Sequence, residues 1–361
     1  MLIRARGTVK SIDAVREGAC ELTVDLAGEP RRAIAYTNLT GPVRVGDEVL
    51  LNVTATTKDL GTGGIDFVMA NLTAPDSGSD GDEPGHIVKA RYTPVQHTVL
   101  SVEEEGSPHR KAIDSFESLG GMPVVIGQLH SQLAPAAAAV KRLSHNRARV
   151  AYVMTDSAAL PLAFSRLVAE LREKGLIDCT ITAGQAFGGD LEAINVYTAL
   201  IAAKQVAGAD VAIVCPGPGH AGTGTQFGFS AIEQGEIVNA ANLLAGSAIA
   251  IARISYADPR PRHQGLSHHT LTALGLVALT KCALALPMID QMKLSMIQEQ
   301  IAHSAISYRH KVRVLEGKPG IIELQEKGIR ISSMGRTYDQ DPEFFLAAAA
   351  AGALAAEGLM V

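Results

Sequence analysis

From Pro123 onward, apolar runs rich in β-branched residues alternate with stretches in which apolar residues recur every three or four positions. The first pattern is typical of buried strands and the second of amphipathic helices. Their alternation indicates βαβ units, which place parallel strands in one sheet with helices on its faces. We therefore expect a Rossmann-like α/β fold with strands at 124–129, 149–155, 178–182, 210–215 and 248–255.

Helix signals lie between these strands. A helix is expected over 160–174, because apolar residues recur at helical spacing there and Gly175 follows as a stop signal. Asp190 is expected to cap a helix that begins at Leu191. The first turns of two later helices are expected at Pro287 and at Pro342.

Residues 1–73 follow a different pattern. Short β-rich runs at 2–12, 20–26, 31–39, 47–55 and 65–72 are separated by turn-forming residues, which predicts a small closed β-barrel of the OB or SH3 kind. Its role is left open between a structural or oligomerising one and binding at its glycine-rich tip, 61–64. Residues 74–85 are acidic and lack large apolar groups, so they are expected to be a flexible linker before the α/β domain at 86–361.

Composition excludes several partners. The formal net charge of −5, with acids and bases interspersed, gives no basic surface for nucleic acid. Four scattered cysteines without a C-x-x-C pair fit buried thiols in a reducing compartment. No export signal and no membrane-spanning run is visible, so a cytoplasmic location is expected. A homodimer is expected only because such assemblies are common among proteins of this kind.

In an open parallel sheet, ligands bind at the carboxyl ends of the strands, where loops and helix N-termini meet. The loop after the fourth predicted strand is rich in glycine, which allows a backbone to approach a phosphate or carboxylate closely. Two threonines are expected to add hydroxyls at a helix N-terminus. The alternative is a tight turn that serves only the topology. The residues expected to bind an anion here are Gly217, Gly219, Gly222, Thr223, Gly224 and Thr225.

This loop spells G-x-G-x-x-G, but it follows the fourth strand, contains Pro218 and has no acidic residue about 20 positions further on at a strand end. It therefore fails the dinucleotide pattern, and NAD is not expected as a cofactor. It also lacks the Gly-Lys-Ser/Thr ending of a nucleotide P-loop.

The loop after the fifth predicted strand combines arginines and histidines. Arg260 and Arg262 suit bidentate recognition of a phosphate or carboxylate, and a nearby histidine suits acid or base catalysis. Asp156 is either a helix cap or a catalytic carboxylate. Cys215 is either a nucleophile or, as the safer interpretation, a buried strand residue. The candidate acid–base residues are His130, Asp156, Asp258, His263 and His268.

A divalent metal is the open question about cofactors. Oxygen and imidazole ligands from His130, Asp156, Asp258 and one histidine of the last loop could be brought together by the fold. The alternative is that these histidines are ordinary hydrogen-bonded loop residues.

Five segments resemble a bacterial family described only as a full-length domain of unknown function, from Gram-positive and related lineages. The segments are 86–94, 120–133, 180–190, 217–228 and 258–274. The resemblance spans nearly the whole chain and supports the domain layout. It implies no activity, substrate or cofactor.

Two functions are consistent with these features. One is a hydrolase or group transferase that acts on a phosphorylated or otherwise anionic metabolite at the carboxyl edge of the sheet. The other is a non-catalytic metabolite sensor or scaffold whose barrel contacts a partner. A purely structural assembly protein is a third possibility, and it predicts no stabilisation by small ligands.

Overall fold

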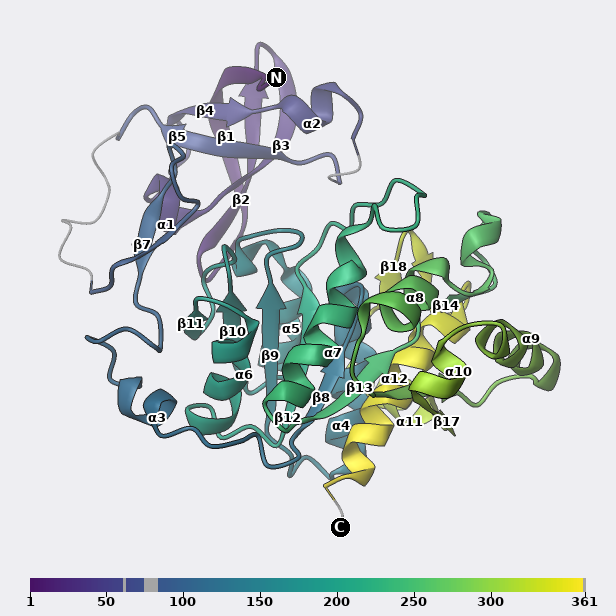
Figure 1. Cartoon of the computed structure of the whole chain (residues 1–361). Coiled ribbons are helices and arrows are strands. Elements are labelled where there is room, and N and C mark those ends of the chain that lie inside the picture. The colour runs from purple at the N-terminus through teal and green to yellow at the C-terminus, as the bar shows by residue number, and fades with distance from the viewer. Residues whose placement is uncertain (61–62, 75–83, 360–361) are drawn as a thin grey trace. The chain divides into compact units, whose positions relative to one another are not determined.

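The computed structural model describes residues 1–60, 63–74 and 84–359. Contacts divide the chain into two compact units, Met1–Val99 and Leu100–Val361 (Figure 1). Residues 75–83 of the predicted linker and residues 61–62 of the predicted tip lie outside the described residues. None of the helices formed by the described residues has both the length and the apolar character that crossing a bilayer requires.

The first unit contains a closed five-stranded barrel in the order β1-β2-β3-β5-β4, as predicted. Its strands are β1 (Arg4–Arg16), β2 (Ala19–Leu26), β3 (Glu29–Ala35), β4 (Glu48–Asn52) and β5 (Asp66–Asn71). Alternate side chains point inward, and Val24, Val49 and Leu51 are completely buried. The other elements of this unit are α1 (Thr37–Thr40), α2 (Thr54–Thr57), β6 (Ile87–Lys89) and β7 (His97–Val99).

The second unit is built on an eight-stranded sheet in the order β11-β10-β9-β12-β8-β13-β16-β17, in which every neighbouring pair is parallel. This confirms the predicted α/β fold with helices flanking a parallel sheet. All carboxyl ends consequently lie along one edge. The strands are β8 (Pro123–Ile126), β9 (Val150–Thr155), β10 (Cys179–Ala183), β11 (Leu191–Ala193), β12 (Val211–Pro216), β13 (Ser247–Ile251), β16 (Ala283–Pro287) and β17 (Lys311–Leu315).

Helices cover both faces of this sheet (Figure 1). One face packs against apolar residues of α6 (Val196–Gln205), α7 (Glu233–Leu243) and α9 (Gln291–Ala302). The other face packs against α4 (Leu133–Leu143), α5 (Arg166–Glu173), α11 (Lys318–Glu326) and α12 (Pro342–Glu357). The predicted helix over 160–174 is shorter than expected, because Leu162–Phe164 forms a separate 3-10 turn and Ser165 caps α5.

Two predicted helix starts are wrong. Asp190 does not cap a helix, because its carboxylate accepts hydrogen bonds from the backbone and hydroxyl of Thr180. Leu191 instead begins strand β11, and Asn195 caps α6. Pro287 ends strand β16, and α9 begins after Asp290, whose side chain caps it.

Short elements complete the edge where the strands end. A 3-10 turn (His130–Gln132) follows β8, and β14 (Ile254–Ser255) pairs with β15 (Gly265–Leu266) after β13. Near the end of the chain, β18 (Ser332–Ser333) and β19 (Arg336–Thr337) form a small hairpin. The remaining helices are α3 (Arg110–Asp114), α8 (His268–Thr272), the π-helical turn Ala273–Val277 and α10 (Ile306–Arg309).

Candidate functional site

A cavity of about 730 Å³ opens where β12, β8 and β13 end side by side in the sheet. We call it the arginine cavity. It is lined by the 3-10 turn after β8, the glycine-rich loop after β12, the segment after β13 and the hairpin near the end of the chain. Nine predicted site residues line it: His130, Gly217, Gly219, Gly222, Gly224, Asp258, Arg260, Arg262 and His263. The expectation that these distant segments form one cleft is confirmed.

Four predicted site residues do not line the arginine cavity. Asp156 lies in a second cavity, and His268 stands beside His263 with ring centroids 5.0 Å apart. The hydroxyls of Thr223 and Thr225 bond to each other at 2.9 Å. Their expected place at a helix N-terminus is wrong, because α7 begins only at Glu233.

Glycine is required at different positions of the loop after β12 for different physical reasons. A Cβ on Gly217 would lie 2.7 Å from the backbone oxygen of Ala159, so a side chain is excluded there. Gly219 and Gly224 have φ angles of 103° and 82°, which favour glycine. Part of the glycine content therefore serves the turn itself, whichever ligand the cavity takes.

Several residues of the arginine cavity were missed by sequence reasoning. Arg253 is the most informative, since it is the single charged residue in the apolar run 248–255 and could have been found for that reason. Nothing in the sequence pattern indicates that the hairpin near residue 334 joins the site. The other missed residues that line the cavity are Arg330, Ser333, Met334 and Arg336.

Arg253 carries a buried charge. Arg253 is 2% exposed, and no carboxylate of the described residues lies within ion-pair distance of its guanidinium. Its guanidinium donates from NH1 to Nδ1 of His269 at 2.9 Å and from NH2 to the sulfur of Met334 at 3.3 Å. Burial, followed by the charge of Arg260, lowers the pKa of Arg253 to about 10, so it remains cationic at neutral pH. A buried cation without a counterion is costly, and a bound anion would supply one.

Among the described residues, Asp258 is the one acidic residue that lines the arginine cavity. Its carboxylate accepts from Nε and NH2 of Arg260 at 2.8 and 2.7 Å, and from NH2 of Arg336 at 3.5 Å. The hydrogen bonds from Arg260 hold the pKa of Asp258 well below its usual range. Asp258 therefore orients two arginines and has no proton to give at neutral pH.

Positive charge dominates this cavity. In the described part of the chain, five arginines and one aspartate line it, a formal excess of four positive charges if the histidines are neutral: Arg253, Arg260, Arg262, Arg330 and Arg336 against Asp258. Asp341 pairs with Arg336 from outside the lining at 3.0 Å, which leaves an excess of three. Such a cavity attracts a ligand with two or more negative charges.

His130 is held at both ring nitrogens. Nδ1 lies 3.2 Å from both the backbone oxygen of Pro216 and the hydroxyl of Tyr152. Nε2 lies 2.7 Å from the hydroxyl of Ser165. Burial lowers the pKa of His130 to about 4. This histidine ties the ends of β8 and β12 together.

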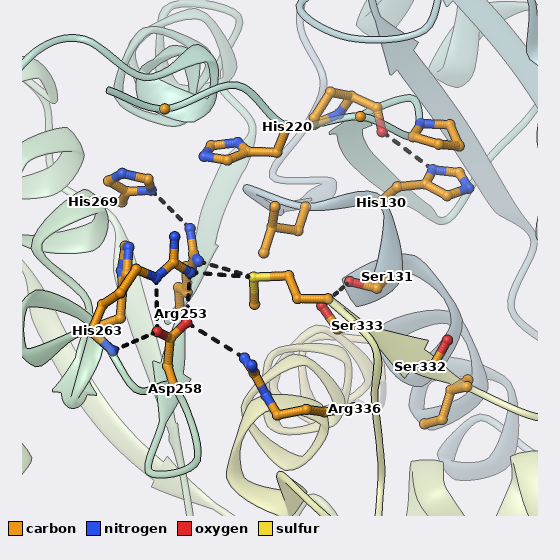
Figure 2. A pocket seen from close by; sticks show the side chains of 18 of the residues that line it. His130, Ser131, His220, Arg253, Asp258, His263, His269, Ser332, Ser333 and Arg336 are labelled. Carbon is orange, nitrogen blue, oxygen red and sulfur yellow. Dashed lines mark hydrogen bonds and ion pairs between the residues drawn. The ribbon is translucent and has the colours of Figure 1, made fainter. Parts of the chain in front are cut away.

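Four histidines gather around Arg253. Ring centroids are 4.3 Å apart for His268 and His269 and 5.0 Å apart for His220 and His269, and the ring of Phe229 stacks on His269 at 3.9 Å. Burial, followed by the charge of Arg253, lowers the pKa of His220 to about 4 and that of His263 to about 3. The cluster is therefore uncharged at neutral pH. Figure 2 shows His263 and His269 near Arg253 and Asp258, with His130 on the other side of the view.

The expected metal set is not assembled, because Asp156 lies in the second cavity and both His130 and Asp258 already use their ligand atoms. Within the described residues, nitrogens of His263, His268 and His269 come within 4.8 Å of one another. The donor set does not suit a cation, however. Arg253 occupies Nδ1 of His269, which places the ring proton on Nε2, and the surrounding arginines repel a metal ion.

The second cavity, of about 560 Å³, lies where β9 and β10 end, beside the first turn of α7. We call it the carboxylate cavity, after its acidic lining residues Asp156, Glu233 and Glu236. Glu233 accepts from the hydroxyls of Thr155 and Ser157 at 2.6 and 2.7 Å. Burial raises the pKa of Glu233.

Cys215 is a buried residue at the end of β12, in agreement with the safer interpretation of the sequence. Burial raises the pKa of its thiol to about 12. A thiol that stays protonated is a poor nucleophile, so we assign no catalytic role to Cys215.

Comparison with known proteins identifies a family for the chain but no activity, substrate or cofactor. The family described as Protein of unknown function (DUF3866) matches residues 32–352, a range that includes parts of both units. The resemblance to a full-length family of unknown function is thereby confirmed. No curated protein matches the chain.

Proposed function

The chain belongs to this family of proteins of unknown function, so its role has to be inferred from the site, and we propose that the arginine cavity binds a phosphorylated or otherwise anionic metabolite on which the protein acts as a hydrolase or group transferase. The observation that carries this proposal is the buried charge of Arg253, which has no carboxylate partner in the described part of the chain. An anionic group of the ligand would neutralise it.

The size of the cavity supports a metabolite rather than a bare ion. A volume of about 730 Å³ falls in the range of small-molecule sites, roughly 300–1,000 Å³. Arg262 and Arg330 line the cavity and are solvent-exposed, so they are placed to meet charges at its mouth. The buried Arg253 and the partly exposed Arg260 beside Asp258 would hold the group on which the chemistry takes place.

His263 is the acid or base that the geometry favours among the predicted residues. It lines the cavity, and its Nδ1 lies 2.7 Å from the hydroxyl of Ser267, which also caps α8. This contact orients the ring, as the partner of a catalytic histidine does. Burial, followed by the charge of Arg253, lowers its pKa to about 3, so the ring is a neutral base at neutral pH.

A screen of anions by thermal unfolding tests the proposal. Nucleotides, sugar phosphates and sulfate are expected to raise the unfolding temperature, and divalent metals alone are not. Any stabilising ligand is then tested for turnover by the wild type and by the His263→Ala variant, which is expected to bind it and to lose turnover. If no anion stabilises the protein, the proposal fails.

A non-catalytic sensor or scaffold is the second candidate, with the barrel as its partner-binding module. It is favoured by the fact that His130 and Asp258, two of the predicted acid–base groups, have their polar atoms engaged by other residues. Binding of a stabilising anion without turnover, unaffected by His263→Ala, would favour this function.

The setting that we propose for this function is the cytoplasm. All four cysteines are free and buried, which supports a reducing compartment. A homodimer without nucleic-acid or membrane partners completes the proposal. Sedimentation of the purified protein and its retention on heparin test the assembly and the nucleic-acid part of the proposal.

A further inference from the structure

The position of one proton in the arginine cavity is fixed by Arg253. A guanidinium has donors only, so Nδ1 of His269, 2.9 Å from NH1 of Arg253, must accept. Since His269 is uncharged at neutral pH, its single ring proton resides on Nε2. That nitrogen lies 3.7 Å from the place that a Cβ on Gly222 would occupy, at the glycine-rich wall of the cavity. His269 consequently presents a hydrogen-bond donor beside Arg253.

The carboxylate of Asp258, which lines the same cavity, has no lone pair left. An ionised carboxylate offers about four acceptor sites. Asp258 receives four donors, from the backbone N, Nε and NH2 of Arg260 and from NH2 of Arg336. It can accept nothing further from a ligand.

We call the part of the arginine cavity formed by Arg253, Arg260, Arg336 and His269 its inner end, and these four residues offer donors. Figure 2 shows Arg253, Arg336 and His269 around Asp258. The hairpin near the end of the chain contributes the sulfur of Met334, which contacts Arg253 and Arg260. A thioether sulfur is only a weak acceptor. A ligand group that carries its own proton would find no strong acceptor among Arg253, Arg260, Arg336 and His269, and burying an unsatisfied donor costs free energy.

We propose that the inner end selects a phosphate monoester in its dianionic form, with Arg253-oriented His269 as the residue that sets this specificity. The proposal rests on the proposed function and names its substrate class. A phosphate monoester loses its second proton near pH 6, so above that pH its three terminal oxygens only accept. The formal excess of three to four positive charges favours this dianion over carboxylates and sulfate esters, which carry one charge.

The test compares glycerol phosphate with inorganic sulfate by titration calorimetry at pH 5 and pH 8. Sulfate is a dianion without a proton at both values, so it reports any change in the protein itself. If the dianion alone binds, glycerol phosphate is expected to bind about tenfold more weakly at pH 5, where roughly a tenth of it is dianionic. The affinity of sulfate is expected to change by less than about twofold, because His220 and His263 stay neutral over this range.

Two variants separate the role of His269 from a general effect. In His269→Gln, the amide can turn its oxygen to a protonated phosphate, so the tenfold pH effect is expected to shrink to about threefold or less. The matched control is His303→Gln, at an exposed position after α9, which is expected to keep the full effect. Unfolding temperatures of both variants verify that they fold.

The nitrogen chemical shifts of His269, assigned by their loss in His269→Gln, report the proton directly. Equal binding of glycerol phosphate at both pH values, or a proton on Nδ1, would overturn this inference while leaving anion binding intact. Tight zinc binding that is lost in His269→Gln would also overturn it, because a ligating Nε2 cannot carry the proton. Failure of both sulfate and glycerol phosphate to bind would instead remove the proposed function.

Discussion

Two cavities open at the same edge of one sheet and carry opposite charges. The arginine cavity lies at the ends of β12, β8 and β13, and the carboxylate cavity lies at the ends of β9 and β10. In the carboxylate cavity, Asp156 and Glu236 are exposed to water, and Glu233 is satisfied by two hydroxyls. In the arginine cavity, Arg253 is buried without a carboxylate partner in the described residues.

This difference shows that the position of a cavity in the fold does not determine which ligand it binds. Parallel strands bring loops together at their carboxyl ends, whatever the loops contain. The carboxylate cavity needs no ligand, because its charges are solvated or hydrogen-bonded. The arginine cavity leaves a charge uncompensated, and that imbalance indicates the ligand.

The largest expected effect is that of Arg253→Met. Removing a buried charged donor should weaken sulfate binding about a hundredfold or more, the equivalent of about 3 kcal/mol. Titration calorimetry measures it. In the absence of anions, the same variant should raise the free energy of unfolding by about 1–2 kcal/mol, because an unpaired buried charge is lost.

The control for Arg253→Met is Arg262→Met, which removes an exposed arginine of the same cavity. A solvated charge contributes little, so sulfate affinity should fall by no more than about fivefold. Equal losses in the two variants would show that net charge, and not the buried guanidinium, holds the anion.

Acid pH should destabilise the arginine cavity through its neutral histidines. The pKa of His263 is lowered to about 3 in the folded protein. Below about pH 6.5 the unfolded chain binds a proton at this residue that the folded protein does not. Stability contributed by His263 is therefore complete above pH 6.5 and is lost as the pH falls, by about 1.4 kcal/mol for each pH unit.

Urea unfolding of the wild type and of His263→Gln at pH 7, 6 and 5 measures this contribution. The variant should lose less stability than the wild type over that range, by about 1.4 kcal/mol for each pH unit. If the two pH dependences are the same, His263 is protonated in the folded protein and the site is more positive than we describe.

The smallest expected effect concerns Glu233→Gln in the carboxylate cavity. Because burial raises the pKa of Glu233, the folded protein holds its proton to a higher pH than the unfolded chain, and stability falls as the pH rises through that window. The amide removes this cost and still accepts from Thr155 and Ser157. The unfolding temperature should rise by about 2 °C at pH 7.5 and stay the same at pH 4.

The same Glu233→Gln variant sharpens the contrast between the cavities, because sulfate should bind it with wild-type affinity. A change of more than about threefold would mean that the two cavities are coupled, against the additivity expected of independent sites.

Much of the fold could be predicted, because long apolar runs and turn residues carry strong local signals. The closed barrel and five sheet strands follow from such runs. Three strands were missed for physical reasons. β11 has only three residues, β16 is a short run that periodicity cannot distinguish from a helix, and β17 is a half-exposed edge strand with lysine and arginine.

The site could be predicted in part. Its main loops follow from the topology rule, so His130, Gly217 and Arg260 were placed correctly at one cavity. Asp156 was not, because strand order decides which loops are neighbours, and β9 is separated from β8 by β12. The hairpin with Met334 joins the cavity from a distant part of the chain, which no local pattern can reveal.

The central claim is that an anion completes the arginine cavity at Arg253. Crystals soaked in selenate, a dianion without a proton, test it most directly through the anomalous scattering of selenium. We predict a selenium peak at a position from which the oxygens of selenate reach Arg253 and Nε2 of His269, and no peak in crystals of Arg253→Met. An empty arginine cavity at a selenate concentration that fills other cationic sites would contradict the account.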